Sequence, residues 1–206
     1  MNAATQRQAI TGPAGALECA VDLPVSSALG TAVLCHPHPQ HGGTMDNKVV
    51  QTMARAMVAL GWRAVRLNFR GVGHSASGWD EGRGEIDDAM AVVAAFRVPG
   101  TRLVLGGFSF GGYIASHVAS RLSAAGEGHA AERVMLIGPA VQTFAMAPVP
   151  ADTLVIQGEV DDVVSMPAVL AWARTQSLPV TVVPGAGHFF HGQLPVLRQI
   201  ISAALR

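Results

Sequence analysis

The chain has 206 residues, of which half are hydrophobic and only 14% are charged. This size and composition fit one globular domain with a sizeable core and exclude a disordered protein. Its 14 basic and 14 acidic side chains cancel to a formal net charge of zero. Because the arginines are scattered rather than gathered in a stripe, we expect no nucleic-acid partner and no membrane partner.

The apolar runs, such as 134–137, are far shorter than the roughly 18 residues that span a bilayer. The first twenty residues lack the continuous apolar stretch of a secretory signal, so we expect a cytoplasmic protein. Cys19 and Cys35 form neither a disulfide framework nor a CxxC motif, and we expect two reduced, buried thiols.

The predicted elements begin after residues 1–16, which we expect to be a loosely ordered leader. An antiparallel edge strand is predicted next, over 17–23. Six short apolar strands then alternate with helical stretches. These strands are predicted over 30–35, 62–69, 102–106, 133–137, 153–157 and 179–183. The helices are predicted over 47–60, 85–96, 112–124, 166–176 and 191–205.

This alternation of strands and helices is typical of a doubly wound α/β sheet. Near-continuous apolar strands are expected where helices cover both faces of a mostly parallel sheet. No repeat or composition break divides the chain, so we predict a single domain over 1–206. In open α/β sheets the ligand site lies at the carboxyl ends of the strands, so the loops that follow strands are the place to look for chemistry.

The loop after the strand at 102–106 contains Gly107-Phe108-Ser109-Phe110-Gly111. A G-x-S-x-G pattern between a strand and a helix predicts a nucleophile elbow, in which the serine sits in a strained turn. The two glycines let the strand and the helix approach each other. We therefore predict Ser109 as a catalytic nucleophile.

A serine nucleophile needs a base, and the base needs an orienting group. Asp161 and Asp162 follow the predicted strand at 153–157, and His188 follows the one at 179–183. This order places a carboxylate and an imidazole at the same sheet edge as Ser109. We predict His188 as the base and Asp161 as the acid, with Asp162 as the alternative acid.

The loop after the strand at 30–35 is a candidate for the oxyanion hole, which needs backbone N–H donors. The amide of Phe110 is one predicted donor, since it follows the nucleophile. Prolines at 37 and 39 have no N–H, so the second donor is His38 or, failing that, Gln40. We choose His38. In the loop at 68–75, Arg70 is interpreted as a structural ion-pair partner.

The segments CHPHPxxGGTMxNKVV, NFRGVGxS, GFSFGG, GExDxVV and GxGHFFHG resemble the α/β-hydrolase superfamily, in particular a compact, lidless bacterial branch of it. The resemblance runs from about residue 30 to the C-terminus. It implies Ser109 as nucleophile, Asp161 as acid and His188 as base. It also implies no lid, and the segment 138–150 leaves no room for a cap domain.

These residues together predict a serine hydrolase that cleaves small acyl esters through an acyl-enzyme, without a cofactor. Thioesters or short peptides are the other substrates considered. The expected pocket is shallow and is lined by Met45, Trp79, Phe108 and Phe189, although the Phe189-Phe190 pair is more readily read as core.

Two other functions compete with this prediction. One is a metal-dependent hydrolase that uses His36, His38 and His41, with His188 and His191 nearby, since imidazole is a common zinc ligand. No carboxylate accompanies these histidines, and a metal site leaves the elbow unexplained. The other is a binding protein that has kept the fold without catalysis.

Overall fold

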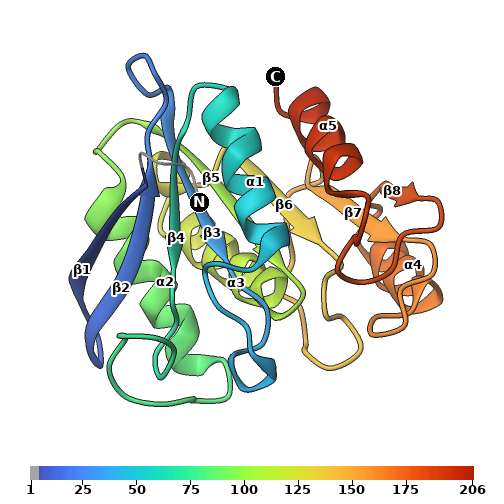
Figure 1. Ribbon diagram of the computed structural model, residues 1–206, viewed down its shortest axis with the longest axis horizontal. Helices are drawn as coiled ribbons and strands as arrows, with labels where there is room; N and C mark the ends of the chain where they lie inside the picture. The colour runs from blue at the N-terminus through green and yellow to red at the C-terminus, as the bar shows by residue number, and fades with distance from the viewer. Residues whose placement is uncertain (1–4) are drawn as a thin grey trace.

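A computed structural model describes residues 5–206, apart from the side chain of Glu127. Eight strands form one sheet in the order β1-β2-β4-β3-β5-β6-β7-β8 (Figure 1). The pairs β1–β2 and β2–β4 are antiparallel, and all other pairs are parallel. The strands are β1 (Gln6–Gly12), β2 (Gly15–Asp22), β3 (Gly30–Cys35), β4 (Arg63–Leu67), β5 (Arg102–Phe108), β6 (Arg133–Ile137), β7 (Leu154–Gly158) and β8 (Val180–Val183).

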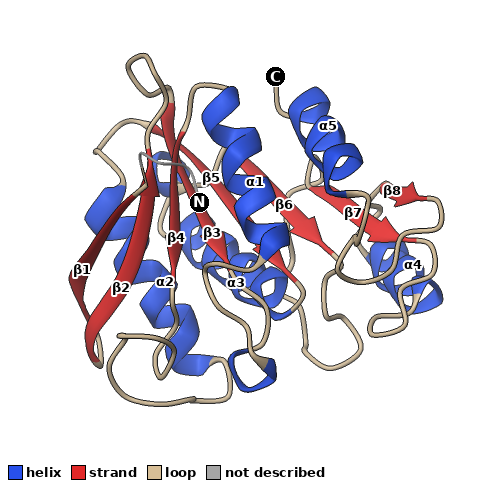
Figure 2. Cartoon of the chain, viewed as in Figure 1, coloured by secondary structure: helices blue, strands red, loops and turns tan. Residues whose placement is uncertain are grey.

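Helices cover both faces of this sheet, which confirms the predicted fold class (Figure 2). Helices α1 and α5 pack on one face, and α2, α3 and α4 pack on the other. The helices are α1 (Lys48–Ala59), α2 (Arg83–Phe96), α3 (Phe110–Ala124), α4 (Met166–Thr175) and α5 (Leu194–Ala204). Each of them overlaps one of the five helices predicted from the sequence.

The central strand β5 shows how the apolar sequence builds this sandwich. Successive side chains of a strand point to opposite faces of the sheet. Leu103 and Leu105 therefore join the core under α2 and α3, whereas Val104 and Phe108 join the core under α1 and α5. All four side chains are buried. A strand buried on both faces reads as a continuous apolar run, which is why the sequence revealed it.

The N-terminal segment differs from the prediction of a loosely ordered leader over 1–16. Residues 6–12 form β1, which pairs with β2 as an antiparallel hairpin, and residues 1–4 lie outside the described residues. The edge strand is therefore β1, not the strand predicted over 17–23. Most of β1 is exposed, and Ile10 is its side chain against the core. A strand with one solvated face and few apolar residues gives a weak sequence signal.

The connection between β6 and β7 bears on access to the sheet edge. Residues 138–153, all of them described, form turns and irregular loop with no helix. No cap therefore rises from this connection over the carboxyl ends of the strands, as expected. In the part of the chain that the structure describes, no helix combines the length and the apolar character that crossing a membrane requires.

Candidate active site

Ser109 lies at a sharp turn between β5 and α3. Its backbone has φ 56° and ψ −117°, a strained conformation for a residue other than glycine. A Cβ atom on Gly107 would collide with the backbone of Gly111, and a Cβ on Gly111 would collide with the carbonyl group of Cys35. Both glycines of the motif are thus required by the close approach of strand, helix and the loop after β3.

Asp161 and His188 are joined directly at the same edge of the sheet. Asp161 follows β7, His188 follows β8, and the Nδ1 atom of His188 lies 2.8 Å from the Oδ2 atom of Asp161. Both side chains are almost fully buried. Asp162, by contrast, is exposed, and no hydrogen bond of its side chain is found among the described residues. Of the two aspartates considered, the structure brings Asp161 to the histidine.

The Asp161 carboxylate is surrounded by hydrogen-bond donors. Its Oδ1 atom accepts from the amides of Val163 at 2.9 Å and Val164 at 2.7 Å. Its Oδ2 atom accepts from Nε2 of Gln157 at 3.0 Å as well as from His188. Burial opposes ionisation, but the hydrogen bonds from His188, Val164 and Val163 outweigh it and lower the pKa of Asp161. The group is therefore a carboxylate at neutral pH.

This carboxylate also fixes the state of the neighbouring imidazole. A carboxylate can only accept hydrogen bonds, so the Nδ1 atom of His188 carries a proton. In the neutral ring the Nε2 atom then bears a free lone pair and can take up a second proton. The site thus contains an oriented base.

Ser109 and His188 both adjoin the carboxyl end of β6. The amide of Ser109 donates to the carbonyl of Ile137 at 2.9 Å. A Cβ atom on the next residue, Gly138, would lie 3.4 Å from the ring of His188. The ring of Phe108, directly before Ser109, has its centroid 4.8 Å from that of His188. The structure therefore brings Ser109 close to the Asp161–His188 pair, and among the described residues no hydrogen bond joins the Ser109 hydroxyl to the His188 ring.

The side chains of the two residues predicted as oxyanion donors pack together. The ring centroids of His38 and Phe110 are 5.2 Å apart. Phe110 is the first residue of α3, so its amide has no partner within the helix. Among residues 5–206, no protein group accepts a hydrogen bond from the amide of Phe110 or of His38. The positive end of the α3 dipole adds a further attraction for an anion here.

The three early histidines do not form a metal site. The Nε2 atom of His36 accepts from the amide of Phe69 at 3.1 Å, and its Nδ1 atom lies 2.6 Å from the carbonyl oxygen of Pro37. Both ring nitrogens of this buried residue are thus occupied. Nowhere in the described chain do three or more histidine, cysteine or acidic side chains gather so that they could hold a metal ion.

Two of the four predicted pocket residues are interior residues. Met45 and Phe108 are fully buried, so neither presents a surface to a substrate. Phe108 ends β5 and its position in the strand turns it toward the core under α1 and α5. Trp79 is half-buried and Phe189 is 43% exposed, so both can be reached. Phe190, by contrast, is fully buried core.

Arg70 has the structural role that we predicted for it. Its guanidinium donates to both carboxylate oxygens of Asp88, at 2.8 and 3.0 Å, and its amide donates to the same side chain. The Asp88 side chain is fully buried. A Cβ atom on Gly84 would overlap the Arg70 guanidinium. This ion pair fastens the loop after β4 to helix α2.

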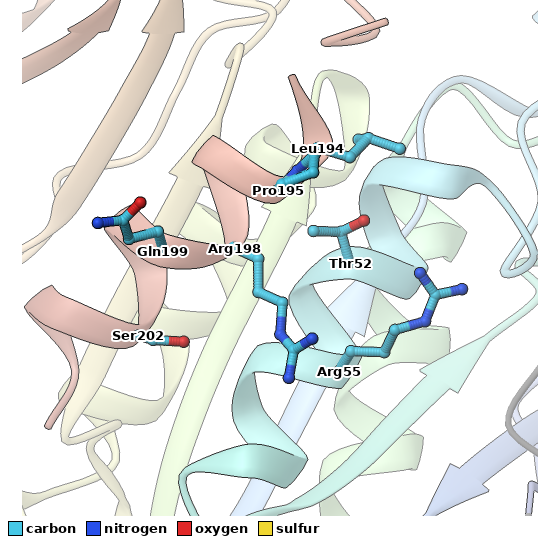
Figure 3. Close-up of a pocket in the computed structure, with 7 residues that line it drawn as sticks. All are labelled: Thr52, Arg55, Leu194, Pro195, Arg198, Gln199 and Ser202. Atoms are coloured by element: carbon cyan, nitrogen blue, oxygen red, sulfur yellow. The ribbon is translucent and has the colours of Figure 1, made fainter. Parts of the chain in front are cut away.

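A groove of about 430 Å³ lies away from these residues, between α1 and α5 (Figure 3). Residues of both helices line it, and it includes none of the residues at the carboxyl edge. Its lining residues are Thr52, Arg55, Leu194, Pro195, Arg198, Gln199 and Ser202.

Two residues at the carboxyl edge escaped the sequence analysis. Gln157 is a buried polar residue in the apolar strand β7, and that contrast was the available signal. Its side-chain amide nitrogen donates a hydrogen bond to the Asp161 carboxylate and another, at 2.8 Å, to the carbonyl of Val164. Phe144 packs against Phe110 with a centroid distance of 5.0 Å. No motif marks it, because its position follows from the path of the loop after β6.

Comparisons with known proteins show the family to which the chain belongs. Residues 33–151, more than half of the chain, match the family described as serine aminopeptidase, S33. The "Uncharacterized protein RP471" of Rickettsia prowazekii is 32% identical over 196 residues, which cover 87% of this chain and 79% of that protein.

Two solved structures are similar over nearly their whole length. One is XC6422 from Xanthomonas campestris, described as an a/b serine hydrolase without lid. It is 39% identical, with a TM-score of 0.88 and coverage of 100% of this chain and 95% of the other. The second is an alpha-beta serine hydrolase homologue from Coxiella burnetii, 37% identical, with a TM-score of 0.84 and coverage of 98% and 97%. The chain therefore belongs to the serine aminopeptidase S33 family of hydrolases and has the α/β-hydrolase fold.

Proposed function

We propose that the protein is a serine hydrolase that cleaves small acyl esters, with Ser109 as nucleophile, His188 as base and Asp161 as orienting acid. The observation that carries this proposal is the 2.8 Å contact of His188 with Asp161 beside a serine in an elbow turn. A base oriented by a buried carboxylate has the arrangement that activates a hydroxyl nucleophile. A cytoplasmic location remains an expectation from the sequence.

The proposed reaction has two steps. In the first, the Nε2 atom of His188 takes the Ser109 proton as the serine oxygen bonds to the ester carbonyl carbon. The amides of Phe110 and His38 hold the oxyanion, and the bond to the alcohol breaks as His188 returns the proton to the leaving oxygen. In the second step a water molecule attacks the acyl-enzyme by the same route. The mechanism calls on no cofactor.

Esters are favoured over the peptides in the family description by the side chains near the oxyanion donors. An aminopeptidase has to bind the ammonium group at the end of its substrate, which a carboxylate does best. The rings that contact His38 are those of His41, Trp79, Phe110 and Phe144, and the groups that shift the pKa of His38 include no carboxylate. Hydrolysis of amino-acid 4-nitroanilides in preference to acyl esters would contradict this choice.

The proposal is tested by labelling with a fluorophosphonate probe and by hydrolysis of 4-nitrophenyl butanoate. We expect Ser109→Ala to lose the label and to lower kcat by at least about 10³-fold while its thermal unfolding stays cooperative. Ser123→Ala serves as a matched control, because Ser123 is an exposed serine on the same helix. A Ser109→Ala protein that is labelled and active like the wild type would refute the assignment.

The metal-dependent alternative predicts a different result. Overnight dialysis against a chelator would abolish the activity of a metallohydrolase, and zinc would restore it. Since His36 has both ring nitrogens occupied, we expect dialysed and untreated protein to have equal activity. A non-catalytic binding protein would be neither labelled nor active.

A further inference from the structure

Five ring-bearing residues pack together beside Ser109. They are His38, His41, Trp79, Phe110 and Phe144, and we refer to them as the aromatic cluster. The His38 ring lies at its centre, with centroid distances of 4.5 Å to both His41 and Trp79, 5.2 Å to Phe110 and 5.8 Å to Phe144. Trp79 and Phe144 also contact Phe110 directly, at 5.2 and 5.0 Å.

The aromatic cluster is tied to the reacting centre by two of its members. Phe110 directly follows Ser109, and the amides of Phe110 and His38 are the proposed oxyanion donors. A carbonyl oxygen bound between these amides would bring the rest of its molecule near the half-buried His38 ring, with the buried Phe110 ring beneath it. The other members come from the loops after β3, β4 and β6.

The rings of the aromatic cluster are only partly covered by the rest of the protein. Phe110 is fully buried beneath the others, His38, Trp79 and Phe144 are half-buried, and His41 is exposed. Burial, with a smaller effect of the neighbouring His41, lowers the pKa of His38, so its ring is neutral at physiological pH. A neutral imidazole, an indole and a benzene ring thus share one solvent-reachable surface. Such a surface is complementary to the face or edge of another aromatic ring.

The loop that carries Trp79 is held in place rather than free. The Glu85 side chain accepts from the amide of Asp80 at 3.0 Å and from that of Gly82 at 2.8 Å, and it is fully buried at the start of α2. Because the Trp79 ring also packs against His38 and Phe110, it is ordered before a ligand arrives, which reduces the entropy lost on binding.

The sheet order decides which part of an ester meets the aromatic cluster. Strands β3 and β4, which precede His38 and Trp79, lie on one side of β5, and β7 and β8, which precede Asp161 and His188, lie on the other. The leaving alcohol takes its proton from His188 and so departs on that side. The acyl group then extends toward the β3 and β4 side, from which His38, His41 and Trp79 come, with Phe144 reaching the same rings from the loop after β6.

We propose that the aromatic cluster binds a planar aromatic ring in the acyl group of the substrate. The preferred substrates are esters of arylalkanoic acids rather than esters of short unbranched acids. This inference rests on the proposed serine hydrolase function and narrows its substrate class.

The test compares three methyl esters whose carbonyl groups have similar reactivity: methyl 3-phenylpropanoate, methyl 3-cyclohexylpropanoate and methyl butanoate. The first two differ in whether the ring is aromatic and flat, so their ratio separates stacking from simple burial of apolar surface. We expect kcat/KM for the phenyl ester to exceed that for the cyclohexyl ester by roughly three- to tenfold, chiefly through KM.

Substitutions in the aromatic cluster test where the aromatic ring of the substrate binds. Trp79→Leu and Phe144→Leu each keep an apolar side chain but remove a stacking face, and each is expected to bring the phenyl-to-cyclohexyl ratio close to one. The matched control is Phe189→Leu, which removes an exposed aromatic ring on the His188 side and should leave the ratio as in the wild type. Using two cluster variants keeps the test valid if one of them folds poorly.

The possible outcomes separate this inference from the function on which it rests. If the wild type is labelled at Ser109 and hydrolyses methyl butanoate but gives a ratio of one, the aromatic site is refuted and the hydrolase stands. Loss of the ratio in Phe189→Leu alone would also refute it, because the ring would then lie on the other side. If Ser109 is neither labelled nor needed for turnover, both proposals fail.

Discussion

The Nε2 atom of His36 accepts a hydrogen bond from the amide of Phe69 at 3.1 Å, although 33 residues separate the two in the chain. His36 begins the loop that carries His38, and Phe69 is the second residue of the loop that carries Trp79. The fully buried imidazole thus fixes these two loops relative to each other. The bond requires an unprotonated Nε2 atom, so this link depends on pH.

We predict that acid weakens the fold through His36. Burial lowers the pKa of His36 to about 4 from an ordinary value of 6.5. Between these values the unfolded chain binds a proton that the folded chain does not, so stability is full above pH 6.5 and falls as the pH drops toward 4. The loss amounts to about 3 kcal/mol. Urea unfolding of the wild type at pH 7 and pH 4 should show this loss of stability. In His36→Gln the difference between the two pH values should be largely absent. His129→Gln, a change at an exposed histidine, should behave like the wild type.

Substitution of the two adjacent aspartates should separate their roles. Asp161→Asn keeps the shape of the side chain but removes the negative charge that holds a proton on Nδ1 of His188. We expect it to lower kcat by roughly 10³- to 10⁴-fold. Asp162→Asn, one residue further on and exposed, should retain wild-type kcat. Steady-state kinetics on 4-nitrophenyl butanoate measures both. Equal losses in the two variants would contradict the assignment of Asp161.

Two further adjacent aspartates, both paired with arginine, give a matched test of burial. Asp88 is fully buried against Arg70, whereas Asp87 is half-exposed against Arg121. Removing one partner of a buried pair leaves an uncompensated charge, and we expect Asp88→Ala to reduce the free energy of unfolding by about 3–5 kcal/mol. Asp87→Ala should change it by less than about 1 kcal/mol. Denaturant unfolding decides between this result and equal effects at the two positions.

Gly111, two residues after the proposed nucleophile, should not tolerate a methyl group. In Gly111→Ala the new Cβ would overlap the Cys35 carbonyl, so α3 or the loop after β3 has to move. We expect a loss of about 1–3 kcal/mol in stability together with a fall in kcat, because the movement shifts at least one of the two proposed oxyanion donors relative to the other. Gly128→Ala is the control, since nothing lies within 4 Å of its added Cβ. Wild-type kcat in Gly111→Ala would argue against the proposed oxyanion hole.

The sequence predicted those parts of the fold that are marked by the residue pattern within a single segment. Strands such as β3 and β5, buried on both faces, appear as apolar runs, and the glycines around Ser109 report a close approach of backbone. Asp161 and His188 were found because each follows a late strand, and parallel strands bring their carboxyl ends to one edge.

The missed features depend on tertiary contacts. Strand β1 has one solvated face and pairs with β2 through backbone hydrogen bonds, which leave little trace in side-chain pattern. Phe108 was predicted to line the substrate pocket, yet the alternation of β5 turns it into the core. Phe144 reaches the aromatic cluster only through the path of a loop.

The helix-free connection at 138–153 has a thermodynamic consequence for substrate capture. An enzyme with a mobile cover divides its molecules between shut and accessible forms, and its apparent affinity falls in proportion to the shut fraction. This chain has no such element in that connection. No fraction of the molecules is therefore closed to substrate by a cover at that place. The proposed discrimination between esters then rests on fixed surfaces such as Trp79, rather than on the free energy of closing a cover over the preferred ester.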